Sequence, residues 1–176
     1  LRENGIKVED MRIIPTPVDD KRFSPLVDGS RIREKYDLQD KRVIVCVGRV
    51  SYEKEIDLII RAAATLDQDI SVLVVGKGPA MDSLKELCQE IGMQDRVIFT
   101  GFVPDEELVE HYRAGNVAAT ASRFETQCLC ALEAMSCGLP VACANARALA
   151  DYVHDGENGY LFDKDVESCA SALNKA

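Results

Sequence analysis

The stretch VIVCVGRVSYEKEIDLIIRAAATL, Val43–Leu66, decides the fold. It opens with a continuous apolar run, Val43–Val47, which is typical of a strand buried on both faces of a sheet. A polar loop follows, and the apolar residues of Ile56–Leu66 then recur at helical spacing. A buried strand that leads directly into an amphipathic helix indicates a parallel sheet covered by helices.

The same alternation of strand and helix continues along the chain. Further strands are predicted at Met11–Ile14, Ser71–Val75, Val97–Thr100, Asn116–Ala121, Pro140–Ala144 and Tyr160–Phe162. Further helices are predicted at Ala80–Ile91, Asp105–Ala114, Thr126–Cys137 and Val166–Lys175. We therefore expect an α/β fold, a doubly wound, Rossmann-like parallel sheet with helices on both faces. Residues 1–30, which hold three prolines, are expected to be a lead-in, and residues 31–176 the domain itself.

Composition excludes several classes of protein. Apolar residues make up 47 % of the 176 and charged residues 29 %, as in ordinary soluble domains. The net charge is −9 and the basic residues are scattered, which argues against nucleic-acid binding. No apolar run approaches the ~18 residues that span a bilayer. Because the chain opens on Leu1 and ends inside a helical pattern, we expect a piece of a longer protein.

The cysteines and histidines give no sign of a metal centre. The seven cysteines are expected to be reduced and mostly buried. Cys128 and Cys130 have the spacing of half a metal site, but no second pair completes it, so no metal is expected. His111, on what is predicted to be a surface helix, and His154, in a turn, are expected to be structural or surface residues.

Ligands of such sheets bind beyond the carboxyl ends of the strands. Arg49 and Lys54 follow the strand Val43–Val47, where two cations suit a diphosphate; the alternative is two solvated surface cations, one of them paired with Glu53. Gly76 and Gly78 follow the next strand and let a ligand or a neighbouring strand approach the backbone closely. The third glycine of a dinucleotide fingerprint is missing there.

The segment Ser122–Pro140 carries the clearest functional pattern. Glu125 stands at the start of the predicted helix and Glu133 two turns further, which places their carboxylates ~12 Å apart. That span suits a sugar at one end, a ribose at the other, and a diphosphate between them at the helix N-terminus. Glu133 lies among apolar residues, so its carboxylate needs a partner or a ligand. The alternative is an amphipathic helix with incidental acids.

Taken together, these motifs resemble glycosyltransferase family 4. The resemblance rests on Val47-Gly48-Arg49 with Glu53-Lys54, Gly76-x-Gly78-Pro79, Val97-x-Phe99-x-Gly101-x-Val103, and Ser122-x-x-Glu125 with Glu133-Ala134-Met135-x-x-Gly138-x-Pro140. It implies the C-terminal, donor-binding domain of a retaining, GT-B-fold transferase, with the acceptor-binding N-terminal domain lying outside this chain.

The resemblance also assigns roles to residues. It implies that Arg49 and Lys54 hold the donor diphosphate and stabilise the departing nucleotide, and that Glu125 binds sugar hydroxyls without acting as a nucleophile. Glu133 would bind the ribose hydroxyls, and the backbone near Val103 would read the base. The remaining substrate contacts would come from Gly48, Gly78, Thr126, Gln127 and the amides of Cys128 and Leu129. No metal and no cofactor would be required.

The triplet Glu125-Thr126-Gln127 resembles that of bacterial glucolipid synthases in the family. This implies a UDP-hexose donor, a lipid or saccharide acceptor, and a cytoplasmic enzyme in peripheral contact with the membrane. The isolated domain is expected to bind nucleotide weakly and to transfer nothing. Two alternatives stay open: a sugar-nucleotide epimerase of the same architecture, and a sugar-nucleotide binding module without catalysis.

The chain departs from the family pattern at three places. Glu55 stands where glycine usually follows the lysine, and it adds a negative charge near the predicted phosphate site. Cys128 occupies another position where glycine is common. The usual acidic motif before the final turn is replaced by Arg147–Asp151, so the resemblance assigns no role to Asp151.

Overall fold

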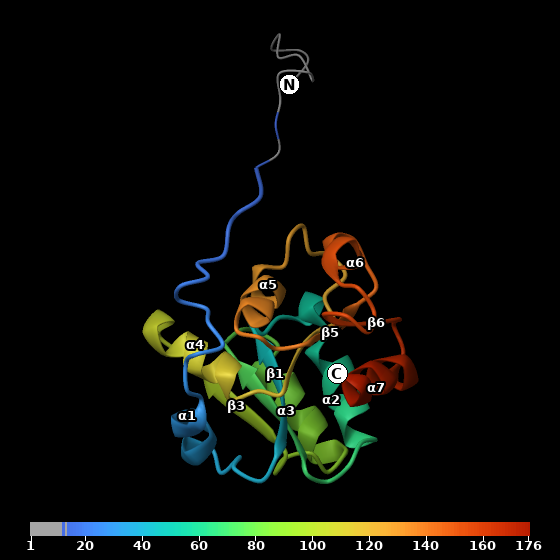
Figure 1. The fold of residues 1–176 in the computed structure, drawn as a ribbon. Helices are drawn as coiled ribbons and strands as arrows, with labels where there is room; N and C mark the ends of the chain where they lie inside the picture. Colours follow the sequence, from blue (N-terminus) through green and yellow to red (C-terminus); the bar gives the residue numbers. More distant parts are fainter. Residues whose placement is uncertain (1–11, 13) are drawn as a thin grey trace.

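A computed structural model describes Arg12 and residues 14–176 (Figure 1). These residues form a six-stranded sheet in which every neighbouring pair of strands is parallel. The strands are β1 (Arg42–Val47), β2 (Ile70–Val75), β3 (Val97–Gly101), β4 (Val117–Thr120), β5 (Val141–Ala144) and β6 (Gly159–Phe162). The predicted doubly wound, Rossmann-like α/β fold is thereby confirmed.

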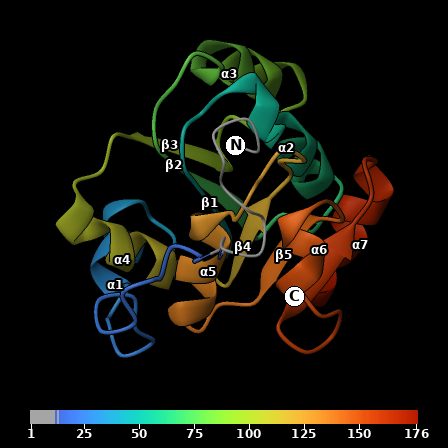
Figure 2. The same cartoon turned by 90° about the horizontal axis from the view of Figure 1, so that it is seen from above.

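Helices cover both faces of the sheet, as the view from above shows (Figure 2). One face carries α2 (Ile56–Ala64), α3 (Met81–Glu90) and α7 (Val166–Lys175), whose apolar residues share one core cluster. The other carries α1 (Ser30–Lys35), α4 (Asp105–Arg113), α5 (Leu129–Ser136) and α6 (Ala148–Tyr152), whose buried residues belong to a second cluster. A single 3-10 turn, η3 (Tyr52–Lys54), precedes α2. In the part of the chain described here, no helix has the length and apolar character needed to cross a membrane.

The central strand β1 shows why its apolar run is continuous. Val43 and Val45 belong to the core cluster on one face, and Ile44 and Cys46 to the cluster on the other. Because successive side chains of a strand point to opposite faces, a strand covered on both sides must be apolar at every position. The same holds for β2, all six of whose residues are buried.

The order of the strands, β3-β2-β1-β4-β5-β6, places a switch point between β1 and β4. The chain runs outward from β1 through β2 to β3 in one direction, and then from β4 through β5 to β6 in the other. The two loops that leave the carboxyl ends of β1 and β4 therefore diverge and leave a crevice, which is where open α/β sheets bind ligands.

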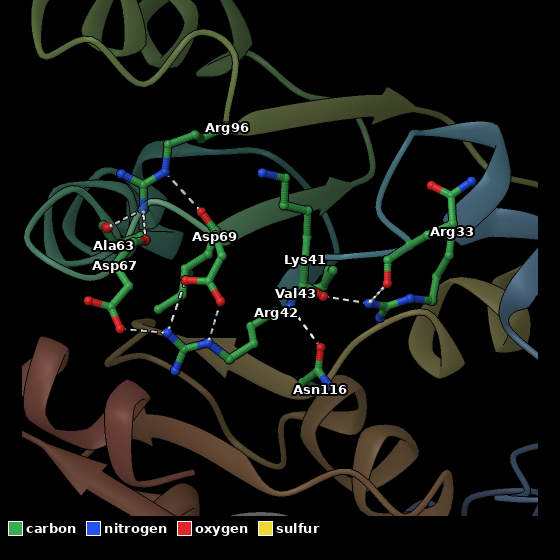
Figure 3. Close-up of polar contacts among 11 residues, drawn as sticks. Arg33, Lys41, Arg42, Val43, Ala63, Asp67, Asp69, Arg96 and Asn116 are labelled. Atoms are coloured by element: carbon green, nitrogen blue, oxygen red, sulfur yellow. Dashed lines mark hydrogen bonds and ion pairs between the residues drawn. The ribbon is translucent and has the colours of Figure 1, made fainter.

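At the opposite, amino end of the sheet, arginines tie loops together (Figure 3). The Arg96 guanidinium donates to the carbonyl oxygens of Ile70, Ala63 and Asp67 at 2.8–3.0 Å. Arg42 at the start of β1 donates to the carboxylates of Asp67 and Asp69. These arginines hold the loops that enter the strands, and they lie away from the crevice.

Most predicted elements are confirmed to within two residues at each end. The main exception is the helix predicted at Thr126–Cys137, which begins only at Leu129 because Cys128 adopts a left-handed backbone (φ 55°) that a right-handed helix cannot include. The sequence reading also missed α1, α6 and η3. Of the strand predicted at Met11–Ile14, Met11 and Ile13 lie outside the described residues, while Arg12 and Ile14 are not in a strand.

Candidate functional site

The loops that follow β1 and β4 meet at the switch point through one ion pair. Lys54, at the end of η3, donates from Nζ to Oε1 of Glu125, 71 positions further along the chain. The two side chains retain 29 % and 17 % of their exposure, so the pair is accessible from the crevice yet partly withdrawn from water. The tertiary fold thus joins two residues that the sequence analysis placed at the diphosphate and the sugar.

Lys54 keeps its positive charge in this setting. Burial lowers the pKa of Lys54, but the hydrogen bond and the negative charge of Glu125 raise it by more, and the net shift is upward. A protonated lysine beside a carboxylate is a strong local cation that a diphosphate can engage. The Glu53 carboxylate instead accepts a hydrogen bond from the Ser51 hydroxyl at 2.6 Å, which lowers the pKa of Glu53.

A cavity of about 270 Å³ opens over the carboxyl ends of β1, β2 and β3. Its lining brings together three predicted substrate contacts, Gly48, Arg49 and Val103. Lys77 and Phe102 complete one wall, with the Lys77 ammonium 5.4 Å from the centre of the Phe102 ring. Lys54 lines a smaller cavity that shares Gly48 and Arg49 with this one.

Gly78 lies close to the chain itself. A Cβ built there would lie 2.2 Å from the carbonyl oxygen of Val50, and the amide of Val50 donates to the carbonyl of Lys77 at 3.1 Å. The chain therefore approaches Gly78 closely, but from the loop after β1 and not from a neighbouring strand. A contact of Gly78 with a ligand stays a prediction.

The loop before α5 is shaped by Cys128. This residue is the N-cap of α5 and has φ 55° and ψ 67°, and within the described chain no side chain caps the helix. The Tyr152 hydroxyl lies at 2.5 Å from the carbonyl oxygen of Gln127, which fixes the loop from the side of α6. The expectation that Glu125 and Glu133 stand on one helix two turns apart is wrong, because Glu125 lies in the loop four residues before Leu129.

Two thiols lie in contact at this helix start. The sulfur atoms of Cys128 and Cys130 are 3.4 Å apart. The hydrogen bond between the two sulfurs lowers the pKa of the Cys128 thiol, and the same bond together with burial raises the pKa of Cys130. All seven cysteines are described and all are free, six of them buried and Cys130 partly exposed.

The side chain of Gln127 points to the lead-in. Its Oε1 accepts from the amide of Thr16 at 3.0 Å, and its Nε2 donates to the carbonyl of Thr16 at 2.5 Å. The side-chain amide of Gln127 therefore bonds to both the N–H and the carbonyl of Thr16, as the main chain of a neighbouring strand would. Its neighbour Thr126 is exposed. Direct donor contacts by Thr126 and Gln127 stay predictions.

The Glu133 carboxylate, which the sequence places among apolar residues, has a hydrogen-bond partner in the fold. The Tyr112 hydroxyl, from α4, donates to Oε2 of Glu133 at 2.7 Å. Burial raises the pKa of Glu133, and burial also raises the pKa of Tyr112 well above its usual range. The bond leaves Oε1 of the carboxylate as a further acceptor at the face of α5.

The surroundings of Glu55 and His111 could not be seen from the sequence. Glu55 forms an ion pair with Lys164, from the loop between β6 and α7. His111 does not lie on a surface: it is fully buried, its Nδ1 donates to the carbonyl of Glu107 at 2.8 Å, and its Nε2 has no partner among the described residues. The helix pattern misplaced it because α1 packs over that side of α4.

Comparison with known protein families decides the family. The model of "Glycosyl transferases group 1" matches residues 28–176. The chain belongs to this family. Among the family's relatives, a GDP-mannose-dependent α-(1-6)-phosphatidylinositol monomannoside mannosyltransferase of Mycolicibacterium smegmatis is 33 % identical over 172 residues, covering 91 % of this chain and 45 % of its own. An α-monoglucosyldiacylglycerol synthase of Streptococcus pneumoniae is 32 % identical, covering 92 % and 38 %. This group 1 chain thus spans less than half the length of these relatives.

Solved structures of GT-B glycosyltransferases share the fold of this group 1 domain. Anabaena HepE, in complex with UDP and glucose, superposes with a TM-score of 0.86 at 26 % identity, covering 98 % of this chain and 49 % of that one. The C-terminal domain of the group 1 protein LpcC from Francisella tularensis has a TM-score of 0.78 at 30 % identity, covering 90 % and 86 %.

Proposed function

We propose that this chain is the donor-binding, C-terminal domain of a retaining hexosyltransferase of family 4 that uses a nucleotide-sugar. The Lys54–Glu125 pair carries the proposal, because it places a permanent cation and a sugar-binding carboxylate side by side at the switch point of the sheet. The likeness of the chain to the crystallised C-terminal domain of LpcC supports the domain assignment.

In the proposed complex, the donor diphosphate lies between the two loops. Lys54 and Arg49 supply positive charge from the β1 side, and the amides of Cys128 and Leu129 supply the positive end of α5 from the β4 side. As the bond between sugar and diphosphate breaks, negative charge grows on the leaving nucleotide. Cations and amides already in place stabilise that charge, which is the task that a metal ion performs in other transferases.

The two glutamates bind the sugars at either end of the donor. Glu125 accepts hydrogen bonds from hydroxyls of the transferred hexose, and Glu133 accepts from the ribose through the oxygen that Tyr112 leaves free. Because Glu125 is already paired with Lys54, its role is binding and not attack on the sugar. The acceptor hydroxyl then approaches on the face from which the nucleotide leaves, with retention of configuration.

We favour UDP-hexose as the donor and a lipid as the acceptor, with a saccharide as the alternative acceptor. HepE is described with UDP and glucose, and both curated relatives named above act, by their names, on phosphatidylinositol or diacylglycerol compounds. The mycobacterial relative depends on GDP-mannose, so the base must be tested directly. A lipid acceptor places the whole enzyme at the cytoplasmic face of a membrane, in peripheral contact.

The first experiment measures donor binding and transfer separately. The 176-residue chain is titrated calorimetrically with UDP, GDP and UDP-glucose, and we expect UDP to bind without added metal and the chain to transfer nothing. The full-length protein is then assayed with Lys54→Ala, where the loss of a charge on the leaving group predicts a fall of about 10²–10³-fold in kcat. Lys85→Ala, which removes an exposed lysine on α3, is the matched control.

Three outcomes would count against the proposal. Conversion of UDP-glucose to an epimer by the full-length protein would identify an epimerase. Unchanged function of Lys54→Ala would identify a binding module without catalysis. Inversion at the anomeric carbon, read by proton NMR of the product, would exclude a retaining reaction.

A further inference from the structure

The geometry points to Cys128 and Cys130 as a reversible dithiol, which a peroxide or a small disulfide closes into a Cys128–Cys130 disulfide at the start of α5. The inference that closure weakens nucleotide binding rests on the proposed function, because it takes the Cys128 and Leu129 amides as the seat of the phosphates. The chemistry of the thiol pair itself does not depend on it.

The two sulfurs are already in contact. Their separation of 3.4 Å must shorten by only about 1.4 Å to reach the length of a disulfide bond. The two residues are two positions apart in the chain, Cys128 as the N-cap of α5 and Cys130 in its first turn. No other element has to move for the bond to form, because both sulfurs belong to one short segment.

The surroundings make one of the two thiols reactive. The hydrogen bond between the two sulfurs lowers the pKa of the Cys128 thiol by more than burial raises it. The Lys54 ammonium lowers that pKa too, while Glu125 opposes it. Since the thiolate is the nucleophile, Cys128 is the attacking sulfur and Cys130 the resolving one. Cys128 itself is buried, and the neighbouring Cys130 is partly exposed and lines the small cavity that holds Lys54, so an oxidant reaches the pair from that side.

The other thiols of the chain lack these features. Burial raises the pKa of each of the five remaining cysteines, Cys46, Cys88, Cys137, Cys143 and Cys169. Cys128 is buried like these five, so what sets it apart is its contact with a second thiol and the lowering of its pKa. Oxidation should therefore be selective for the pair at the start of α5.

With hydrogen peroxide as the oxidant, the reaction balances in two steps. The Cys128 thiolate attacks one peroxide oxygen and breaks the O–O bond, so that Cys128 becomes a sulfenic acid and the other oxygen leaves as hydroxide, which takes up the thiol proton as water. The sulfur of Cys130 then attacks the Cys128 sulfur, forms the S–S bond and expels a second water. Two thiols are oxidised and one peroxide is reduced to two waters.

Closure changes the site through the backbone. The disulfide joins Cys128 and Cys130 in a small ring that contains the peptide units on both sides of Leu129. The ring contains the amides of Leu129 and Cys130, so the Leu129 amide loses its freedom to turn toward a ligand. Loss of one charged hydrogen bond to a phosphate predicts a fall in nucleotide affinity of about tenfold or more.

The test uses the 176-residue chain, reduced with a phosphine, treated with one equivalent of hydrogen peroxide, and then blocked with N-ethylmaleimide. We expect the peptide that holds both residues to lose two hydrogens in mass and to take up no maleimide, and dithiothreitol to reverse this. UDP and GDP are titrated into the reduced, oxidised and re-reduced chain. Cys130→Ser should abolish the internal bond, whereas Cys137→Ala, at the other end of α5, should retain it.

The outcomes are distinct. Maleimide on both Cys128 and Cys130 after peroxide would overturn the dithiol. A disulfide that leaves nucleotide affinity unchanged would overturn the coupling to the donor site. A reduced chain that binds neither nucleotide would overturn the proposed function, and the mass measurement would still decide the thiol chemistry.

Discussion

Glu55 and Cys128 share a left-handed backbone, with φ of 47° and 55°. Each is the N-cap of the helix that follows a loop of the crevice, Glu55 for α2 and Cys128 for α5. Both stand where the family that the sequence resembles usually has glycine. The geometry gives the physical reason for that glycine, since an L residue in this conformation costs about 1–2 kcal/mol. This chain keeps the left-handed conformation at both positions although neither residue is glycine.

Replacing Cys128 with glycine should relieve this strain. We expect the free energy of unfolding of Cys128→Gly to exceed that of Cys128→Ala by about 1 kcal/mol. The reason is that alanine keeps the Cβ that the left-handed region disfavours. Both variants lack the thiol, so their difference isolates the backbone. Urea denaturation followed by circular dichroism measures it. An alanine variant as stable as the glycine variant would refute the strain.

Gln127 should hold the lead-in against the crevice. Gln127→Ala removes both hydrogen bonds to Thr16 and should raise the hydrogen-exchange rate of the Thr16 amide by about fivefold or more, since each such bond contributes ~1 kcal/mol. Gln127→Glu keeps the acceptor for the Thr16 amide but loses the donor, and it should lie between wild type and alanine. Identical exchange in all three proteins would show that the pairing has no energetic weight.

The ionised Glu133 carboxylate should lower the stability of the fold while strengthening the binding of nucleotide-sugar. Burial raises the pKa of Glu133 above its ordinary value of 4.5, so the folded state holds the proton more readily than the unfolded chain. Ionisation of the carboxyl therefore costs stability, and that cost grows as the pH rises above about 4.5. Glu133→Gln removes the cost and still accepts from Tyr112.

The Glu133→Gln variant should gain stability over wild type between pH 4 and pH 7 and, at the same time, bind nucleotide-sugar about tenfold more weakly. Thermal denaturation across this pH range and calorimetric titration check the two halves. Tyr112→Phe, which removes only the hydroxyl, is the control for the hydrogen bond. A stability difference that does not change with pH would refute the assignment.

His111 should make the fold sensitive to acid. Burial lowers the pKa of His111 below its ordinary 6.5. Below pH 6.5 the imidazole is therefore protonated more readily in the unfolded chain than in the folded state. Stability is therefore present above pH 6.5 and falls as the pH drops below it, by up to about 1.4 kcal/mol per pH unit.

His111→Gln should flatten the fall of the melting temperature between pH 7 and pH 5. His154→Gln, at an exposed position in a turn, should not. Scanning calorimetry of the three proteins provides the comparison. A wild-type melting temperature that stays constant over this range would exclude the effect.

The sequence was sufficient for the strands and the long helices because their patterns are local. The buried run of β1 and the spacing of α2 can be read from neighbouring residues alone. The start of α5 could not be read in this way, since nothing in the types of Thr126 and Gln127 shows that the left-handed backbone of Cys128 excludes them from the helix. Short α1 and α6 were missed because five or six residues carry no period that can be recognised.

The candidate site divides in the same way. Residue types and their positions in the chain predicted Arg49, Lys54, Glu125 and Glu133, and the family resemblance added Val103. The sequence could not predict that Tyr112 bonds to Glu133, Lys164 to Glu55 and Thr16 to Gln127. These partners come from segments distant in sequence and have no motif of their own. Tyr112 alone offered a hint, as an aromatic residue on the apolar side of its helix.

The sequence by itself determined a parallel α/β domain with charged residues in the loops after its strands, since hydrophobic period and loop chemistry are properties of short segments. Only the tertiary structure decided that Lys54 meets Glu125, that Glu133 rests on Tyr112, and that the thiols of Cys128 and Cys130 touch. Contacts of this kind depend on where the sheet places whole elements and on the backbone angle of a single residue. No local pattern records either of them.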